Sequence, residues 1–280
     1  MKIAATVEEI RSAVKAWKKE GLSVGFVPTM GYLHEGHQSL MQKAVSENDR
    51  VVVSIFVNPM QFGPSEDLES YPRDLEKDAS LCEASGVDLI FHPEPKEMYH
   101  SDFSSFVEMH GPTESPCGES RPAHFRGVCT VVTKLFNIVQ PDCAYFGQKD
   151  AQQLAVIQQM VRDLNLDVTV IGCPIIREAD GLAKSSRNSY LSADERKAAL
   201  VLSQALEVAK QLLANGEQNA AKIRNAISET IQAEPLAKVD YVELVDARTL
   251  QQVDSVERPV LVALAVYIGK TRLIDNFITE

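Results

Sequence analysis

Two histidines, His34 and His37, lie in a glycine-containing turn between the apolar run 22–27 and the helical-looking segment 38–45. The first backbone N–H groups of a helix lack intrahelical partners, and the helix dipole adds partial positive charge there, so a turn that enters a helix favours an anion. Two imidazoles can reach the same anion, and Gly36 between them carries no side chain that would block a phosphate. The pattern indicates a phosphate site. Its alternative is a surface helix capped by two histidines.

Polar side chains also follow two other apolar runs. Asn58 and Gln61 come after the run 50–57, and Lys149 comes after the run 143–146. Open α/β sheets bind their ligands at the carboxyl ends of the strands, so the two amides are candidates for substrate contacts. A lysine at such a place neutralises phosphate or stabilises charge that develops at phosphorus. The alternatives are ordinary loop amides and a surface lysine.

Two further segments carry charges that suit a nucleotide. Lys184-Ser185-Ser186-Arg187 combines two cations with two hydroxyls and loop amides, which suits a triphosphate, although charged loops that contain serine are common. The acidic stretch 66–78 includes Asp78, a candidate magnesium ligand. The alternative for these acids is a solvated helix face.

The elements that must position these residues follow from periodicity. Thr6 and Glu9 have the spacing of a capping box, and apolar residues at helical spacing follow up to Gly21. Strands alternate with helices up to about residue 174, which predicts βαβ units and a parallel sheet, whereas residues 175–280 predict a smaller α+β domain. We expect strands at 22–27, 50–57, 87–91, 143–146, 168–171, 239–245, 259–268 and 271–277, and helices at 7–20, 38–45, 127–139, 151–161, 193–214 and 217–233, with another that ends near Ser85.

Composition narrows the classes of partner. The chain has 280 residues, 45% of them hydrophobic, and its net charge of −11 opposes non-specific attraction to nucleic acid or anionic membranes. No apolar stretch approaches the roughly 20 residues of a membrane span, and the N-terminus lacks a secretory apolar core, so we expect a cytoplasmic protein that binds neither nucleic acid nor membranes. The five cysteines form no Cys-x-x-Cys pair and are expected to be reduced and mostly buried.

The paired signatures at His34–His37 and Lys184–Arg187 resemble those of the HIGH-type nucleotidyltransferase superfamily, in which both flank the phosphates of ATP. Further blocks along nearly the whole chain resemble the pantothenate synthetase family. These blocks are residues 28–37 (PTMGYLHEGH), 57–62 (VNPMQF), 71–73 (YPR), 124–128 (HFRGV), 146–150 (FGQKD), 185–188 (SSRN) and 272–276 (RLIDN).

The resemblance implies an ATP-dependent ligase that joins pantoate to β-alanine through a pantoyl adenylate and releases pyrophosphate and AMP. It implies a Rossmann-like parallel-sheet domain, here residues 1–174, followed by a smaller α+β lid domain, residues 175–280. A homodimer and a requirement for Mg²⁺ are implied as well.

Residue roles combine this resemblance with charge. His34, His37, Lys149 and Arg187 are expected to act in catalysis, with His37 the preferred proton donor. Gln61 and Gln153 resemble the amides that hold pantoate, Asn58 is a further substrate candidate, and Asp78 is the one candidate metal ligand. The expected ATP contacts are Met30, Gly31, Tyr32, Leu33, His34, Glu35, Gly36, His37, Gly147, Gln148, Lys149, Asp150, Ile176, Lys184, Ser185, Ser186 and Arg187.

Some positions depart from the family pattern. Lys184 stands where the family often has an apolar residue, so its phosphate role rests on chemistry alone, and Ala123 stands where glycine is usual. The loop-rich segment 101–126 is a candidate gate.

Three other functions are alternatives to the ligase. The first is another small-molecule nucleotidyltransferase, and the second is an aminoacyl-tRNA synthetase, which would need a basic RNA-binding surface. The third is a non-catalytic metal-binding module, but the spacing of His34 and His37 matches no structural zinc pattern.

Overall fold

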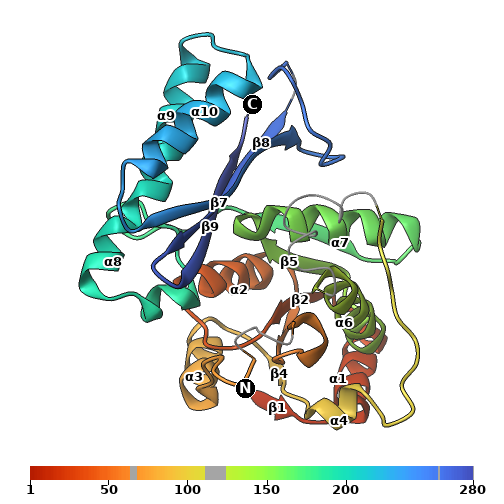
Figure 1. The fold of residues 1–280 in the computed structure, drawn as a ribbon. Coiled ribbons are helices and arrows are strands. Elements are labelled where there is room, and N and C mark those ends of the chain that lie inside the picture. Colours follow the sequence, from red (N-terminus) through yellow and green to blue (C-terminus); the bar gives the residue numbers. More distant parts are fainter. Residues whose placement is uncertain (64–67, 111–123, 258, 280) are drawn as a thin grey trace.

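The computed structural model describes residues 1–63, 68–110, 124–257 and 259–279. Its N-terminal part is a six-stranded parallel sheet in the order β1-β4-β3-β2-β5-β6 (Figure 1). The strands are β1 (Lys2–Ala4), β2 (Val24–Thr29), β3 (Arg50–Ile55), β4 (Leu89–Phe91), β5 (Cys143–Gly147) and β6 (Thr169–Cys173).

Helices cover both faces of this sheet because its central strands are apolar on both sides. Val52 of β3 belongs to the core shared with α1 (Val7–Lys19), α6 (His124–Val139) and α7 (Ala151–Asp163), whereas Val53 belongs to the core shared with α2 (Glu35–Glu47) and α3 (Leu75–Ala84). This doubly wound arrangement confirms the predicted α/β class. Shorter helices are η1 (Pro59–Gln61), α4 (Pro95–Met98) and η2 (Gln148–Asp150).

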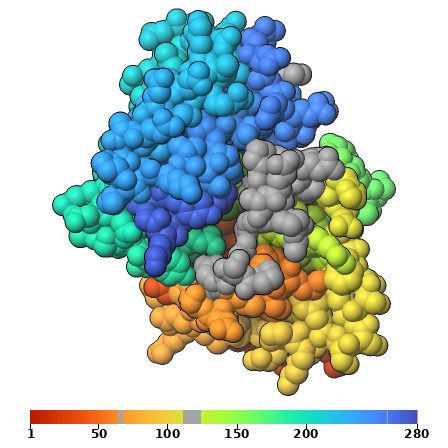
Figure 2. All heavy atoms as spheres, viewed as in Figure 1, coloured from red at the N-terminus to blue at the C-terminus, as the bar shows by residue number. Residues whose placement is uncertain are grey.

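The C-terminal part contains a three-stranded antiparallel sheet in the order β7-β8-β9. One face packs on α9 and α10 through a second apolar core, and the opposite face meets Ala151 and Ala155 of α7. The elements are η3 (Ser186–Tyr190), α8 (Ala193–Ala198), α9 (Leu200–Ala214), α10 (Ala220–Gln232), β7 (Ala237–Asp246), β8 (Val260–Ile268) and β9 (Thr271–Ile278). In Figure 2 this part, in blue, forms a separate lobe above the first. The domain boundary at 174/175 stays a prediction.

The structure corrects some predicted elements. The helix after the histidine turn begins at Glu35 rather than near residue 38, so His34 is its N-cap and His37 lies in its first turn. The helix predicted from residue 127 starts at His124, and the one predicted over 193–214 is two helices that join at Ala199. The short strand β1 was not predicted.

Two other expectations, the capping box and the reduced cysteines, are confirmed. The capping box of Thr6 and Glu9 is present. The four cysteines within the described residues are free thiols, and Cys82, Cys129 and Cys173 are buried. No helix in the described ranges has the length and apolar character needed to cross a bilayer. The candidate gate at 101–126 lies partly, and Ala123 entirely, outside the described residues.

Candidate active site

A cavity of about 240 Å³ opens at the carboxyl ends of β2, β3 and β5. Strand β2 pairs with β3 on one side and with β5 on the other. From β2 the strands continue through β3 and β4 toward one edge of the sheet and through β5 and β6 toward the other, so the strand order reverses between β2 and β5. The cavity therefore lies at the topological switch point of the sheet. The fold therefore places His34, Gln61 and Lys149, which follow three different strands, around one space.

The turn after β2 is held by a buried carboxylate. Gly31 and Tyr32 have φ angles of 83° and 52°, and the next residue leads into α2. Asp78 of α3, only 1% exposed, accepts the Tyr32 N–H at 2.8 Å and the Leu33 N–H at 2.6 Å. Burial raises the pKa of Asp78, and these two hydrogen bonds oppose the rise. Asp78 thus anchors the turn that carries the histidines.

Hydrogen bonds fix the tautomers of both histidines. His34 caps α2: its Nδ1 accepts the Gly36 N–H at 3.1 Å. The His37 Nδ1 in turn accepts the His34 N–H at 3.3 Å. Because both Nδ1 atoms are acceptors, each neutral ring carries its proton on Nε2, and both rings line the cavity. A Cβ on Gly36 would lie 2.9 Å from the His34 ring, so glycine is needed there to keep this ring in place.

Both imidazoles are neutral at neutral pH. Burial, followed by the charge of Lys149, lowers the pKa of His34 to about 4. Burial, followed by the proximity of His34 and then Lys149, lowers the pKa of His37 to about 3. The ring centroids are only 4.1 Å apart, so the two rings disfavour simultaneous protonation. The pair therefore offers two N–H donors without a positive charge of its own.

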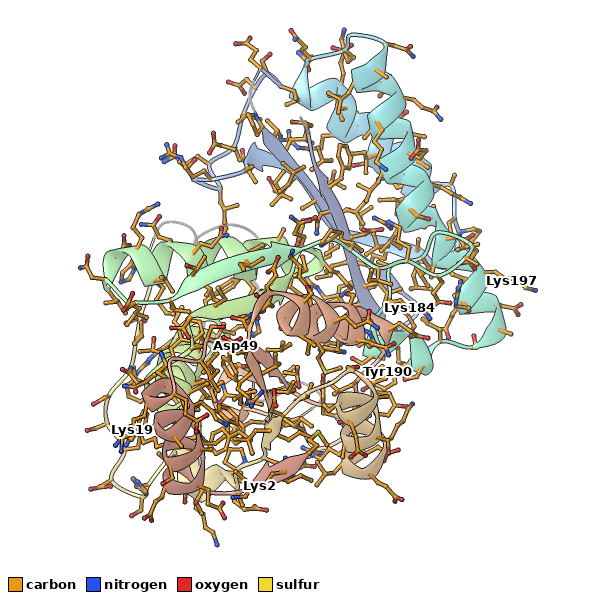
Figure 3. All side chains as sticks on the ribbon, turned by 180° about the vertical axis from the view of Figure 1, so that it is seen from behind. Lys2, Lys19, Asp49, Lys184, Tyr190 and Lys197 are labelled. Carbon is orange, nitrogen blue, oxygen red and sulfur yellow. The ribbon has the colours of Figure 1, made fainter. Side chains whose placement is uncertain are left out.

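The segment Lys184–Arg187 contacts the start of α2, which carries the two histidines, through an ion pair. Lys184 Nζ lies 3.3 Å from Glu35 Oε2, at the beginning of α2 (Figure 3). Ser185 caps η3 by accepting the Arg187 N–H at 3.3 Å, and the loop from Lys184 to Arg187 lines the cavity. Glu35 points its carboxylate at this lysine instead of at the cavity wall, so its side chain serves to join the two signatures.

The two amides after β3 play different parts. Asn58 is 1% exposed; its Nδ2 donates to Gln61 Oε1 at 3.0 Å and to the Gly127 carbonyl at 3.2 Å, and its Oδ1 accepts the Tyr99 hydroxyl at 2.8 Å. Asn58 therefore positions Gln61, whose Nε2 reaches Met30 Sδ at 3.0 Å. This engaged side chain argues against a substrate contact of Asn58, although the residue borders the cavity.

Helix α6 contributes an apolar wall that was not predicted from the sequence. Val128, Val131, Val132 and Leu135 line the cavity at helical spacing. The same spacing is typical of any helix that packs on a core, so no signal in the sequence separates the two uses. Tyr71, a member of a recognised block without an assigned role, completes this wall with other apolar or small residues, namely Pro28, Thr29, Leu40, Phe56, Tyr145, Phe146, Pro174 and Ile175.

A close approach holds α6 against η1. A Cβ on Gly127 would lie 2.4 Å from the Met60 carbonyl oxygen and 2.6 Å from Gln61 Cα, which no side chain tolerates. His124 Nδ1 lies 3.0 Å from the Gln61 carbonyl at the start of the same helix. The apolar wall and the Gln61 amide therefore form one rigid unit.

A second cavity, of about 820 Å³, lies between α7 and the face of the C-terminal sheet that α9 and α10 leave uncovered. Both cavities are bordered by Lys149, Asp150, Gln153, Ser185 and Arg187. The smaller cavity holds the chemical groups predicted from the sequence, and the larger one leads from it toward the C-terminal part of the chain.

The residues present do not fit a metal held by Asp78, because both oxygens of this carboxylate already accept backbone N–H groups. Over the described ranges, no three residues among His, Cys, Asp and Glu gather into a metal-binding group.

Most of the predicted site residues come together at the smaller cavity. Those outside its wall are Gly31, Tyr32, Leu33, Glu35, Gln148 and Asp78, which shape or anchor the segments behind it. Those in the wall are Met30, His34, Gly36, His37, Asn58, Gln61, Gly147, Lys149, Asp150, Gln153, Ile176, Lys184, Ser185, Ser186 and Arg187.

Comparisons with known proteins agree over the full length. The family model described as Pantoate-beta-alanine ligase matches residues 2–278. The chain is 63% identical over 280 residues to a pantothenate synthetase of Enterococcus faecalis, and the match covers 100% of this chain and 99% of the relative. It is 61% identical over 277 residues to that of Clostridium acetobutylicum, with 99% of each chain covered.

Solved structures give the same result. The pantothenate synthetase of Thermus thermophilus superimposes with a TM-score of 0.93 at 46% identity and covers 99% of both chains. The pantoate-beta-alanine ligase of Francisella tularensis, complexed with beta-gamma ATP and beta-alanine, superimposes with a TM-score of 0.81 at 36% identity and covers 99% of this chain and 97% of its own.

Proposed function

Because the chain belongs to the pantoate-beta-alanine ligase family, we propose here how its cavity residues divide the work of the reaction. The chain is an ATP-dependent ligase that joins pantoate to β-alanine. In the first step a pantoate carboxylate oxygen attacks the α-phosphorus of ATP and pyrophosphate leaves. In the second step the β-alanine amine attacks the acyl carbon of the pantoyl adenylate, AMP leaves and the amine loses a proton.

The observation that carries the assignment of roles is the pair of Nε2–H donors in the smaller cavity. His34 and His37 present them at the start of α2, and the Lys149 ammonium lies close enough to lower the pKa of both rings. These groups suit the phosphates of ATP, whose negative charge shifts toward the leaving pyrophosphate in the first step. Lys184, Ser185, Ser186 and Arg187 border the same cavity and add two cations and two hydroxyls for these phosphates.

The first step needs no proton transfer, since a carboxylate displaces a pyrophosphate anion. His37, with its pKa lowered to about 3, therefore acts as a neutral hydrogen-bond donor and not as an imidazolium acid. A glutamine amide reproduces an Nε2 donor more closely than an asparagine amide does, because it is one methylene longer. His37→Gln should thus keep more adenylate-forming activity than His37→Asn; the reverse order would contradict the tautomer assigned to His37.

Pantoate combines a carboxylate and hydroxyls with a gem-dimethyl carbon. The cavity has polar side chains for the first groups and an apolar surface for the methyl groups. Gln61 and Gln153 supply amides that hold hydroxyl and carboxylate groups without a competing charge. Val131 and Val132 face the same space and suit the two methyl groups. β-Alanine would then reach the acyl carbon beside Gln61, where orientation next to the activated acyl group drives the second step.

An assay that monitors AMP tests the overall assignment. AMP should form only when ATP, pantoate and β-alanine are all present, whereas leaving out β-alanine should stop AMP release and limit the release of pyrophosphate to about one equivalent of enzyme. Steady AMP release without β-alanine, or none with all three, would contradict the ligase reaction. The requirement for Mg²⁺, the homodimer and the cytoplasmic location stay predictions; a titration with EDTA and light scattering of the purified protein test the first two.

A further inference from the structure

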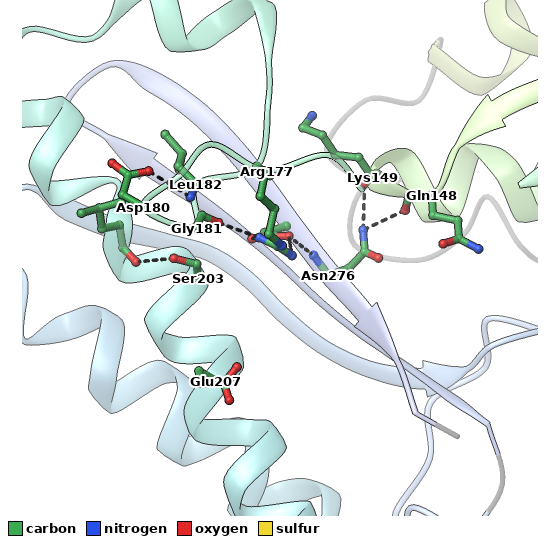
Figure 4. Close-up of polar contacts among 12 residues, drawn as sticks. Gln148, Lys149, Arg177, Asp180, Gly181, Leu182, Ser203, Glu207 and Asn276 are labelled. Atoms are coloured by element: carbon green, nitrogen blue, oxygen red, sulfur yellow. Dashed lines mark hydrogen bonds and ion pairs between the residues drawn. The ribbon is translucent and has the colours of Figure 1, made fainter. Parts of the chain in front are cut away.

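Two neighbouring residues of β9, Asp275 and Asn276, belong to a recognised block of the sequence but have no part in the reaction described above. Asn276, 4% exposed, uses its side-chain N–H groups on the N-terminal part of the chain: Nδ2 donates to the Gln148 carbonyl at 3.1 Å and to the Lys149 carbonyl at 2.8 Å (Figure 4). These hydrogen bonds fix the main chain of η2, the short turn that carries the Lys149 ammonium.

Asp275 faces the other phosphate-binding segment. Its carboxylate is 1% exposed and pairs with Arg177 through two hydrogen bonds, of 2.6 and 2.9 Å. Arg177 Nη1 also donates to the Gly181 carbonyl at 3.0 Å, and its backbone bridges to Ala183. Arg177 therefore ties Asp275 to the hairpin that leads directly into Lys184.

The two neighbours are also locked to each other, since Asp275 Oδ1 accepts the Asn276 N–H at 2.8 Å. A continuous chain of hydrogen bonds thus runs from the Lys149 turn through Asn276, Asp275 and Arg177 to the hairpin before Lys184. Strand β9 contacts both η2 and η3, and Lys149, Ser185 and Asp275 border one small void of about 10 Å³. The two segments meet on this strand.

We propose that Asp275 and Asn276 are positioning residues that couple the two phosphate-binding segments, so that Lys149 and the Lys184–Arg187 loop are held at one separation for adenylate formation. The proposal rests on the phosphate roles given above. In this arrangement the C-terminal sheet acts as the frame of the ATP site. The acceptors of Asn276 are main-chain carbonyls, so the effect does not depend on a side-chain contact with substrate.

Substitution of Asn276 tests the proposal in the two half-reactions separately. Asn276→Ala removes both donors, and Asn276→Asp removes them at nearly constant volume. Exchange of pyrophosphate into ATP in the presence of pantoate should fall about 10- to 100-fold in both variants, since small misplacements of charged groups reduce rates by such factors. Condensation of supplied pantoyl adenylate with β-alanine, which involves no pyrophosphate, should change less than about threefold.

A control variant and the outcomes that would overturn the proposal are judged by the same comparison of the two half-reactions. Asn137→Asp, on the exposed face of α6, adds the same charge away from the cavity and should leave both half-reactions unchanged. An equal loss in both half-reactions would indicate general disruption and overturn the proposal. A defect confined to Asn276→Asp would attribute it to charge and overturn it too. Failure of the wild type to release AMP would instead contradict the proposed function.

Reciprocal loosening gives a readout that is independent of activity. Hydrogen exchange should speed up in residues 183–188 when Asn276 is substituted, although the Asn276 side chain donates to Gln148 and Lys149 and not to that segment. It should also speed up in residues 148–151 in an Asp275→Asn variant, since coupling between two sites is mutual. Exchange that increases only in the segment directly contacted by the substituted residue would overturn the coupling.

Discussion

Acidification should weaken the folded protein through the two histidines of the cavity. Their folded-state pKa values of about 4 for His34 and about 3 for His37 lie below the 6.5 of an unfolded imidazole. A depressed pKa means that the unfolded chain binds protons first as the pH falls. The stability that depends on neutral rings is therefore fully present above pH 6.5 and is lost as the pH falls toward 4.

The size of this loss follows from the proton uptake of the unfolded state. At pH 5 an imidazole of pKa 6.5 gains RT ln(1 + 10^1.5), about 2 kcal/mol, by protonation, while the folded ring of pKa 3 or 4 gains almost nothing. Two independent rings would sum to about 4 kcal/mol. Solvent at the cavity mouth and the coupling between the rings reduce this, so we expect a loss of about 2–4 kcal/mol between pH 8 and pH 5.

Urea unfolding of the wild type and of the double variant His34→Gln/His37→Gln, measured from pH 8 to pH 5, isolates the effect. All other titrating groups are common to both proteins, so the difference between their free energies of unfolding should change by about 2–4 kcal/mol across this range. The variant should lose less stability on acidification. A difference that stays constant with pH would refute the reasoning that burial keeps the rings neutral.

Three further changes test the packing and the anchors of the site. Gly127→Ala places a methyl group 2.4 Å from the Met60 carbonyl; we expect a loss of about 1–3 kcal/mol in urea unfolding and a higher KM for pantoate. Asp78→Asn presents an amide N–H₂ to the Tyr32 or Leu33 N–H and should lower both the melting temperature and kcat. Gln153→Ala should raise the KM for pantoate about tenfold with an unchanged melting temperature, as one lost hydrogen bond to a charged group implies.

Regular features of the fold were predictable because their signals are local. Strand β3 is an almost unbroken apolar run, and this pattern alone indicates a strand covered on both faces. The start of α2 was predictable only in part. A helix capped by the two histidines was one interpretation of the turn, and His34 is indeed the cap, but its imidazole takes the place of the usual serine, threonine or aspartate, so apolar spacing alone indicated a helix only from residue 38.

The roles of buried polar residues depend on contacts between distant segments. Asp78 lies in an acidic stretch that suggests a solvated face or a metal ligand, yet α3 turns it toward the backbone of residues 32 and 33. Asn58 follows a strand, as a substrate ligand would, but the approach of α6 and Tyr99 encloses it. The coupling through Asn276 likewise appears only when β9 lies beside η2.

The contact of Gly127 with the backbone of η1 bears on how the specificity of this chain can change. Because the two backbones touch, the distance between the Gln61 amide and the face of α6 cannot drift with a few substitutions elsewhere. On the α6 side of the cavity, a change in the acyl substrate must then come from the side chains of Val128, Val131, Val132 and Leu135. Each methylene gained or lost there adjusts discrimination by about 1–3 kcal/mol. Natural and engineered changes in specificity for the acid substrate are thus expected at the same few positions of α6.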